Sequence, residues 1–133
     1  MSAKSAQTSR PLSPFMLGPY YKPQLTSMLS ITHRLTGVAL SVGTIFLVAW
    51  LMAAAGGEQS YAAFSECASA WYGQIILIGF TWALSFHLCN GLRHLWWDLG
   101  RGFDLKTVYA TGYAVVIVSI VLTASVWLVA CCL

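Results

Sequence analysis

The chain has 133 residues, of which 58% are hydrophobic and only 8% charged, and its formal net charge is +3. A soluble globular protein carries about 25% charged residues, so this composition excludes an ordinary soluble fold. The windows 35–57, 67–92 and 107–133 contain no Asp, Glu, Lys or Arg. Each window exceeds the roughly 20 residues that a spanning helix needs. The sequence therefore predicts an all-α integral membrane protein with three transmembrane helices over residues 27–133.

Residues 1–26 form an N-terminal segment that precedes the first predicted span. All four prolines lie between Arg10 and Pro23, so this stretch is expected to be extended or turning. Its first ten residues lack an apolar core, so it does not read as a secretory signal peptide. We expect the segment to lie along the cytoplasmic membrane surface or against a partner protein.

The first predicted span covers about residues 27–55 and is ended by Gly56 and Gly57, with Thr26 or Ser27 as its N-terminal cap. Small or polar side chains recur along this span at steps of three and four. Such a stripe is typical of a close helix–helix packing face. We assign that packing role to three positions of the stripe, which are Gly37, Ser41 and Thr44.

The first two turns of this span carry a different group, Ser30, His33 and Arg34. Taken alone, Arg34 can simply extend toward the lipid headgroups. A hydroxyl and a guanidinium on one helix face also suit a quinone, since the hydroxyl can donate to a carbonyl oxygen. The fixed cation then stabilises negative charge on the quinone, and His33 can relay protons. Both interpretations stay open at this point.

A short outer segment at residues 59–69 precedes the second predicted span, about residues 71–97, which holds His87 and, seven residues later, His94. Positions seven apart nearly superimpose on a helix, so both share one stripe with Gly91 and Asp98. A deep imidazole is a suitable axial ligand for haem b, and Arg93 and His94 near the aqueous edge can pair with its propionates. The alternatives are a hydrogen bond from His87 across a helix interface and a surface role for His94.

Asp98 ends that stripe, where it can pair with Arg93 or Arg101 or take part in a proton relay. The inner loop that follows contains Gly100 and Gly102 as helix breakers, and the third predicted span covers about residues 108–132. The four cysteines form no C-x-x-C motif, so neither a zinc site nor a covalently attached haem is supported.

Charge placement predicts the orientation of the spans. The seven Lys and Arg residues lie toward the N-terminus or around the inner loop, whereas the loop between the first two spans carries only Glu58 and Glu66. The positive-inside rule therefore predicts an N-terminus in the cytoplasm, or in an equivalent compartment, and a C-terminus on the other side. Because no targeting peptide is evident, we expect a bacterial inner membrane with a periplasmic C-terminus. We expect membrane lipid around the spans and no nucleic-acid partner.

Three motifs now stand together: Arg10-Pro-Leu-Ser-Pro14, Ser30-Ile-Thr-His-Arg-Leu-Thr-Gly37 and His87-x6-His94-Leu-x-x-Asp98. In this order they resemble the cytochrome b anchor subunits of succinate dehydrogenase, respiratory complex II, over nearly the whole chain. Many members have His where Phe15 stands and Leu where Thr32 stands. The resemblance implies a heteromeric helix bundle with a second membrane anchor, attached to an iron–sulfur subunit and a flavoprotein subunit.

The resemblance also implies roles for individual residues. His87 would be a haem b axial ligand, with the second ligand supplied by the other anchor, and Ser30 and Arg34 would belong to the ubiquinone site. His33, Arg34 and His94 would lie near the haem propionates. The chain would serve electron transport and the tricarboxylic acid cycle without binding succinate itself. Two alternatives stay open: the anchor of a quinol:fumarate reductase and a non-catalytic, haem-free membrane scaffold.

Overall fold

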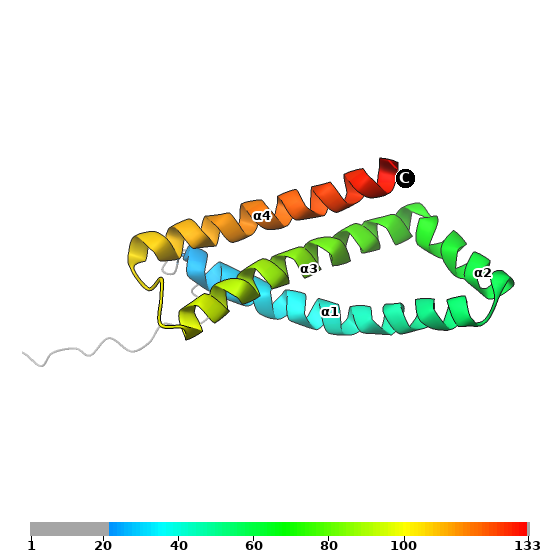
Figure 1. Cartoon of the computed structure of the whole chain (residues 1–133), viewed down its shortest axis with the longest axis horizontal. Helices are drawn as coiled ribbons and strands as arrows, with labels where there is room; N and C mark the ends of the chain where they lie inside the picture. Colours follow the sequence, from blue (N-terminus) through cyan, green and yellow to red (C-terminus); the bar gives the residue numbers. More distant parts are fainter. Residues whose placement is uncertain (1–21, 133) are drawn as a thin grey trace, which may run out of the picture.

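The computed structural model describes residues 22–132 and confirms the all-α prediction for them. It contains α1 (Leu25–Ala55), α2 (Glu58–Ser69), α3 (Trp71–Asp98) and α4 (Leu105–Cys132) (Figure 1). By length and composition, α1, α3 and α4 are able to cross a membrane, and they correspond to the three predicted spans. The expectations for the proline-rich segment concern residues 1–21, which lie outside the described part of the chain.

The helix ends differ from prediction at the start of α1. The helix begins at Leu25 after Gln24, which forms no side-chain capping bond, so the predicted cap at Thr26 or Ser27 was wrong. At its other end, the φ angle of Gly57 is 98°, a left-handed conformation that glycine adopts easily and that turns the chain into α2. The predicted outer segment is therefore a helix that begins at Glu58.

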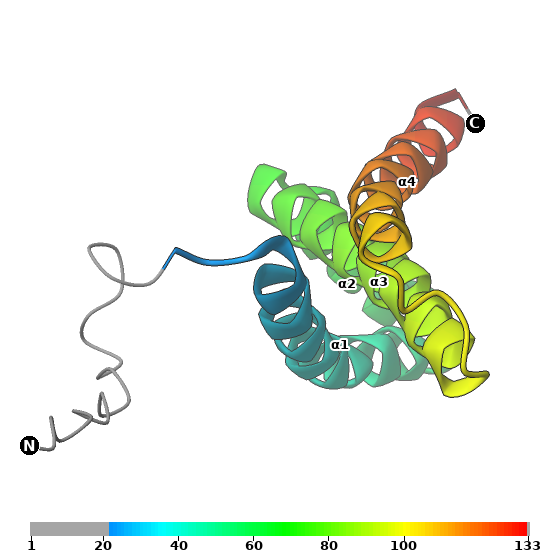
Figure 2. The same ribbon diagram turned by 90° about the vertical axis from the view of Figure 1, so that its left-hand side faces the viewer.

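The central helix of the bundle is α3, which packs against both α1 and α4. It runs antiparallel to each of them (Figure 1). Seen from the end that holds the start of α1, α1 and α4 flank α3 on different sides (Figure 2). We call this end the basic end, because the described cationic side chains lie at or near it: Lys22, Arg34, Arg93, Arg101 and Lys106.

The small core lies toward the basic end, where all three long helices meet. Leu29, Phe86 and Val115 are buried there, one from each helix. Gly112 permits this approach, since a Cβ atom at that position would lie 3.0 Å from both Leu25 and Leu29. Most other large apolar side chains are exposed, as expected for helices that meet lipid or other subunits. The core thus braces the end of the bundle that carries the candidate site.

Candidate functional site

Three histidines from α1 and α3 form a stack near the basic end. The ring centroids of His33 and His87 are 4.0 Å apart with an interplanar angle of 11°. On the same side of α3, the His94 ring lies 5.2 Å from His33 at 14°. Gly91 lies between the two α3 histidines, and a Cβ atom there would lie 4.0 Å from His33 Cε1. The structure therefore brings the predicted groups of the first and second spans together.

The His87 ring is held at Nδ1 by two groups of α1. Nδ1 lies 3.2 Å from Thr36 Oγ1 and 3.2 Å from the backbone oxygen of His33. A carbonyl oxygen can only accept, so Nδ1 carries the proton and donates. The other nitrogen, Nε2, keeps its lone pair in the neutral ring, which is the form that binds metals.

Thr36 was missed by the sequence analysis, although it is 4% exposed and contacts the most informative histidine of the chain. Its hydroxyl also donates to the His33 oxygen at 2.9 Å. The available signal was a hydroxyl residue three positions after His33, on the helix that faces His87. Spacing alone did not separate it from the other hydroxyl residues of α1.

Two further histidine contacts bear on a cofactor. The Nδ1 atom of His33 is buried without a hydrogen-bond partner among the described residues, so a carboxylate or another acceptor would satisfy it. His94 directs its Nδ1 at the backbone oxygen of Asn90, 2.8 Å away, which leaves its Nε2 for another contact. Both side chains can therefore meet an acidic group at the edge of the stack.

The donor set fits haem better than a bare metal ion. Within residues 22–132, no group of three or more His, Cys, Asp or Glu side chains is placed to hold an ion. A haem iron needs only axial ligands from protein, because the macrocycle fills the other positions. One available imidazole nitrogen at His87, together with an unpartnered polar atom at His33, matches that requirement.

Ser30 and Arg34 lie on the same α1 stretch as His33. They are one helical turn apart and therefore share a face. Ser30 is half-buried and Arg34 is exposed. The hydroxyl and the guanidinium thus lie on one face of the first three turns of α1, in the same stretch as His33.

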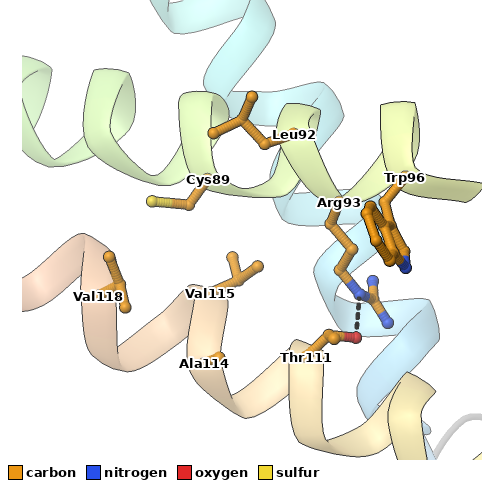
Figure 3. Close-up of a pocket in the computed structure, with 8 residues that line it drawn as sticks. All are labelled: Cys89, Leu92, Arg93, Trp96, Thr111, Ala114, Val115 and Val118. Carbon is orange, nitrogen blue, oxygen red and sulfur yellow. Dashed lines mark hydrogen bonds between the residues drawn. The ribbon is translucent and has the colours of Figure 1, made fainter. Parts of the chain in front are cut away.

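Arg93 lies in a different place from the other predicted residues, because its side chain points toward α4 (Figure 3). It is only 6% exposed, and it donates from Nε to Thr111 Oγ1 at 3.1 Å and from Nη2 to the Val108 oxygen at 2.9 Å. Its guanidinium carbon is also 4.1 Å from the centre of the Trp97 ring. Trp97 in turn meets His94 edge-on at 5.2 Å, so Arg93 reaches the histidines only through that indole.

The groove beside Arg93 has a volume of about 320 Å³ and lies between α3 and α4. Apart from Arg93 and Thr111 its lining is mainly apolar, as Figure 3 shows: Cys89, Leu92, Trp96, Ala114, Val115 and Val118. None of the histidines lines it. The groove is therefore separate from the histidine stack.

Two further interpretations from the sequence concern the ion pairing of Asp98 and the packing stripe of α1. Asp98 is exposed, and in residues 22–132 it forms no ion pair with either predicted arginine, since Arg93 bonds to α4 and Arg101 lies 5.6 Å from the Trp96 ring. In the proposed packing stripe, Gly37 does face α3, because a Cβ atom at this position would lie only 3.1 Å from His87 Cε1.

Ser41 and Thr44 are instead exposed, and their hydroxyls donate to carbonyl oxygens of their own helix. Neither α3 nor α4 covers these two positions, so their packing role stays a prediction for contacts with another helix. The contacts of this part of α1 with α3 are made instead at Gly43, where a Cβ atom would lie 2.9 Å from the Phe80 ring, and at Phe46.

Comparison with known proteins gives a consistent picture. Residues 7–126 match a family described as the succinate dehydrogenase/fumarate reductase transmembrane subunit. The succinate dehydrogenase cytochrome b556 subunit of Rickettsia prowazekii is 44% identical over 118 residues, covering 89% of this chain and 90% of its own length. The subunit of the same name from Paracoccus denitrificans is 38% identical over 114 residues, 86% of each chain. The mitochondrial cytochrome b560 subunit of Mus musculus is 35% identical over 121 residues, 88% of this chain and 69% of the mouse chain.

Proposed function

We infer the function from the fact that this chain belongs to the succinate dehydrogenase/fumarate reductase transmembrane subunit family. We propose that it is the cytochrome b anchor of a succinate dehydrogenase in a bacterial inner membrane, with its basic end in the cytoplasm. A flavoprotein and an iron–sulfur subunit would dock at that end, and a second membrane anchor would complete the bundle. The names of the similar bacterial proteins favour succinate oxidation over fumarate reduction.

The haem proposal depends above all on the His87 ring, whose Nδ1 is engaged by α1 and whose Nε2 is therefore available. His87 would be one axial ligand of haem b, and the second anchor would supply the other. His33, Arg34 and His94 would hold the propionates, and Arg93 would support that edge by fixing Trp97. When bound, the haem supplies a one-electron redox centre within the membrane.

Ubiquinone would bind beside the same stretch of α1. The Ser30 hydroxyl would donate to one quinone oxygen, and the Arg34 guanidinium would stabilise negative charge on the ring as electrons arrive. Two protons must also reach the reduced quinone. His33 and the exposed Asp98, which both lie toward the basic end, are suited to pass them from water.

Absorption spectroscopy of the purified complex tests the haem proposal. We expect reduced-minus-oxidised b-type bands in the wild type and at least a tenfold loss of their amplitude in His87→Ala. Loss of an outer-shell partner alone costs about 10- to 100-fold in metal affinity, and this variant loses the ligand itself. Gly79→Ala is the matched control on α3, since a Cβ atom there meets nothing within 4 Å. A complex without b-type bands would instead support the haem-free scaffold.

The quinone site has its own test in Ser30→Ala and Arg34→Ala. Both should lower succinate–quinone activity by on the order of tenfold to a hundredfold while succinate oxidation with an artificial dye is retained. Ser41→Ala is the control, because that hydroxyl is exposed on the same helix and bonds only to its own backbone. Wild-type quinone kinetics in both variants would remove these residues from the site.

A further inference from the structure

Three residues of α1 contact different parts of the His87 imidazole, and we call them the imidazole seat: His33, Thr36 and Gly37. The His33 ring covers one face of the imidazole at 4.0 Å, and the Thr36 hydroxyl meets Nδ1 at 3.2 Å. Gly37 leaves space at Cε1, where a Cβ atom would come within 3.1 Å. The ring is thus constrained at a face, at a nitrogen and at an edge by less than two turns of one helix.

The hydrogen bonds at Nδ1 give Thr36 a particular role. The His33 oxygen lies in the middle of α1, where the helical pattern already has it accept the Gly37 amide. The Thr36 hydroxyl donates to the same oxygen at 2.9 Å, so both lone pairs of that oxygen are engaged. The less occupied acceptor for the Nδ1 proton is therefore the Thr36 oxygen, which accepts from no other group within residues 22–132.

Thr36 also differs from the other hydroxyl residues of α1. Ser41 and Thr44 donate to carbonyl oxygens of their own helix in the same way, but both are exposed. Thr36 is 4% exposed and is contacted by a ring nitrogen from another helix. A threonine that served only local helix geometry would not need that contact.

We propose that Thr36 is a positioning residue for the haem ligand, an inference that rests on the proposed binding of haem by His87. The hydroxyl oxygen of Thr36 accepts the Nδ1 proton and fixes both the tautomer and the rotation of the ring. Nε2 is thereby presented to the iron as a strong donor. Hydrogen bonding of this kind raises the donor strength of a ligating imidazole, which favours ferric over ferrous iron.

The experiment is a redox titration of the haem in the purified complex, with the midpoint potential as its readout. In Thr36→Val the shape is kept and the hydroxyl acceptor is lost, which leaves Nδ1 the His33 oxygen that the helix already uses. Ferric affinity should therefore fall at least threefold relative to ferrous affinity. At 59 mV per tenfold for one electron, this is a rise of about 28 mV in potential. Thr36→Ser should restore the wild-type potential, and Thr44→Val is the matched control that should leave it unchanged.

The outcomes separate this inference from the function on which it rests. A haem-loaded Thr36→Val complex with the wild-type potential would overturn the positioning role while leaving the haem site intact, as would a serine variant that behaves like valine. If the valine variant does not assemble, Thr36→Ala removes the hydroxyl without branching at Cβ and is compared with Thr36→Ser. Retention of full b-type bands in His87→Ala would instead refute the proposed ligand itself.

Discussion

At the scale of single residues, Gly37 allows the α1 backbone to lie close to the His87 ring of α3. Its missing side chain is the reason that the His87 edge can lie so close to the α1 backbone. A serine or alanine at this position would demand a shift of a few tenths of an ångström in the ring, and a branched side chain would demand more. The small residue is therefore part of the imidazole seat, although it offers no chemistry of its own.

This role predicts that Gly37→Val displaces the His87 ring and weakens haem retention. The loss of haem per complex should be on the order of tenfold, because the ring no longer meets both α1 acceptors. Haem content is measured from the pyridine haemochrome spectrum against protein concentration. Gly79→Val adds the same side chain to α3 at an open position, so equal haem contents in the two variants would contradict the prediction.

At the scale of helices, different contacts hold the two long neighbours against α3. On the α1 side they are the histidine stack and the bonds to His87. On the α4 side the buried Arg93 donates to Thr111 and to the Val108 oxygen. A buried guanidinium without partners is costly in low dielectric, so these bonds explain why the residue stays inside. Near the basic end, polar groups therefore orient both helix pairs.

The side chain of Asp104 caps the start of α4. Hydrogen bonds from the Thr107 side chain and then from its backbone amide, 2.9 Å from Oδ2, hold the pKa of Asp104 below its ordinary value. The carboxylate caps the helix in its charged form. Because the folded-state pKa is the lower one, this stabilisation is complete above the unfolded value of about 3.9 and is lost as pH falls through the folded value.

We therefore expect Asp104→Ala to increase fraying of the first turn of α4 at neutral pH, and acidification of the wild type below about pH 4 to have the same effect. Hydrogen exchange of the Thr107 amide in detergent measures the opening. Asp104→Asn is the control, because an amide oxygen still caps but does not titrate in this range. The prediction is wrong if exchange at Thr107 is the same in the alanine variant and the wild type.

At the scale of the whole molecule, the charge asymmetry predicts which side each end of the bundle faces. The basic end should be cytoplasmic, so the end of α4 at Cys132 should face the periplasm. In a variant that keeps only Cys132 of the four cysteines, a membrane-impermeant maleimide should label intact spheroplasts. With Arg101→Cys as the single cysteine, labelling should require permeabilisation, and the reverse pattern would invert the topology.

Much of this architecture was predictable because membrane spans follow from local composition. The predicted spans, 27–55, 71–97 and 108–132, match the three long helices to within a few residues, and Gly100 and Gly102 do turn the chain at left-handed φ angles of 74° and 78°. The seven-residue spacing of His87 and His94 placed both on one face, which the stack with His33 confirms. These features depend on helix geometry alone.

The remaining features depend on which helix lies beside which, and sequence spacing carries no such information. Arg93 is next to His94 in the chain, but it points to α4 and not to the histidines. Thr36 looked like any other hydroxyl of α1 until His87 was placed against it. The expected partners of Asp98 were chosen by charge, whereas Arg93 contacts Trp97 and the Val108 oxygen, and Arg101 lies over the Trp96 ring.

The imidazole seat also determines how α1 is rotated about its own axis. Lipid surrounds a spanning helix almost uniformly, so an apolar helix gains little free energy from any one rotation about its axis. Successive side chains on α1 are about 100° apart, so a turn of that size would separate the rings, the hydroxyl and the glycine from His87 all at once. The contacts with His87 therefore determine the rotation of α1 about its axis, which the surrounding lipid would leave undetermined.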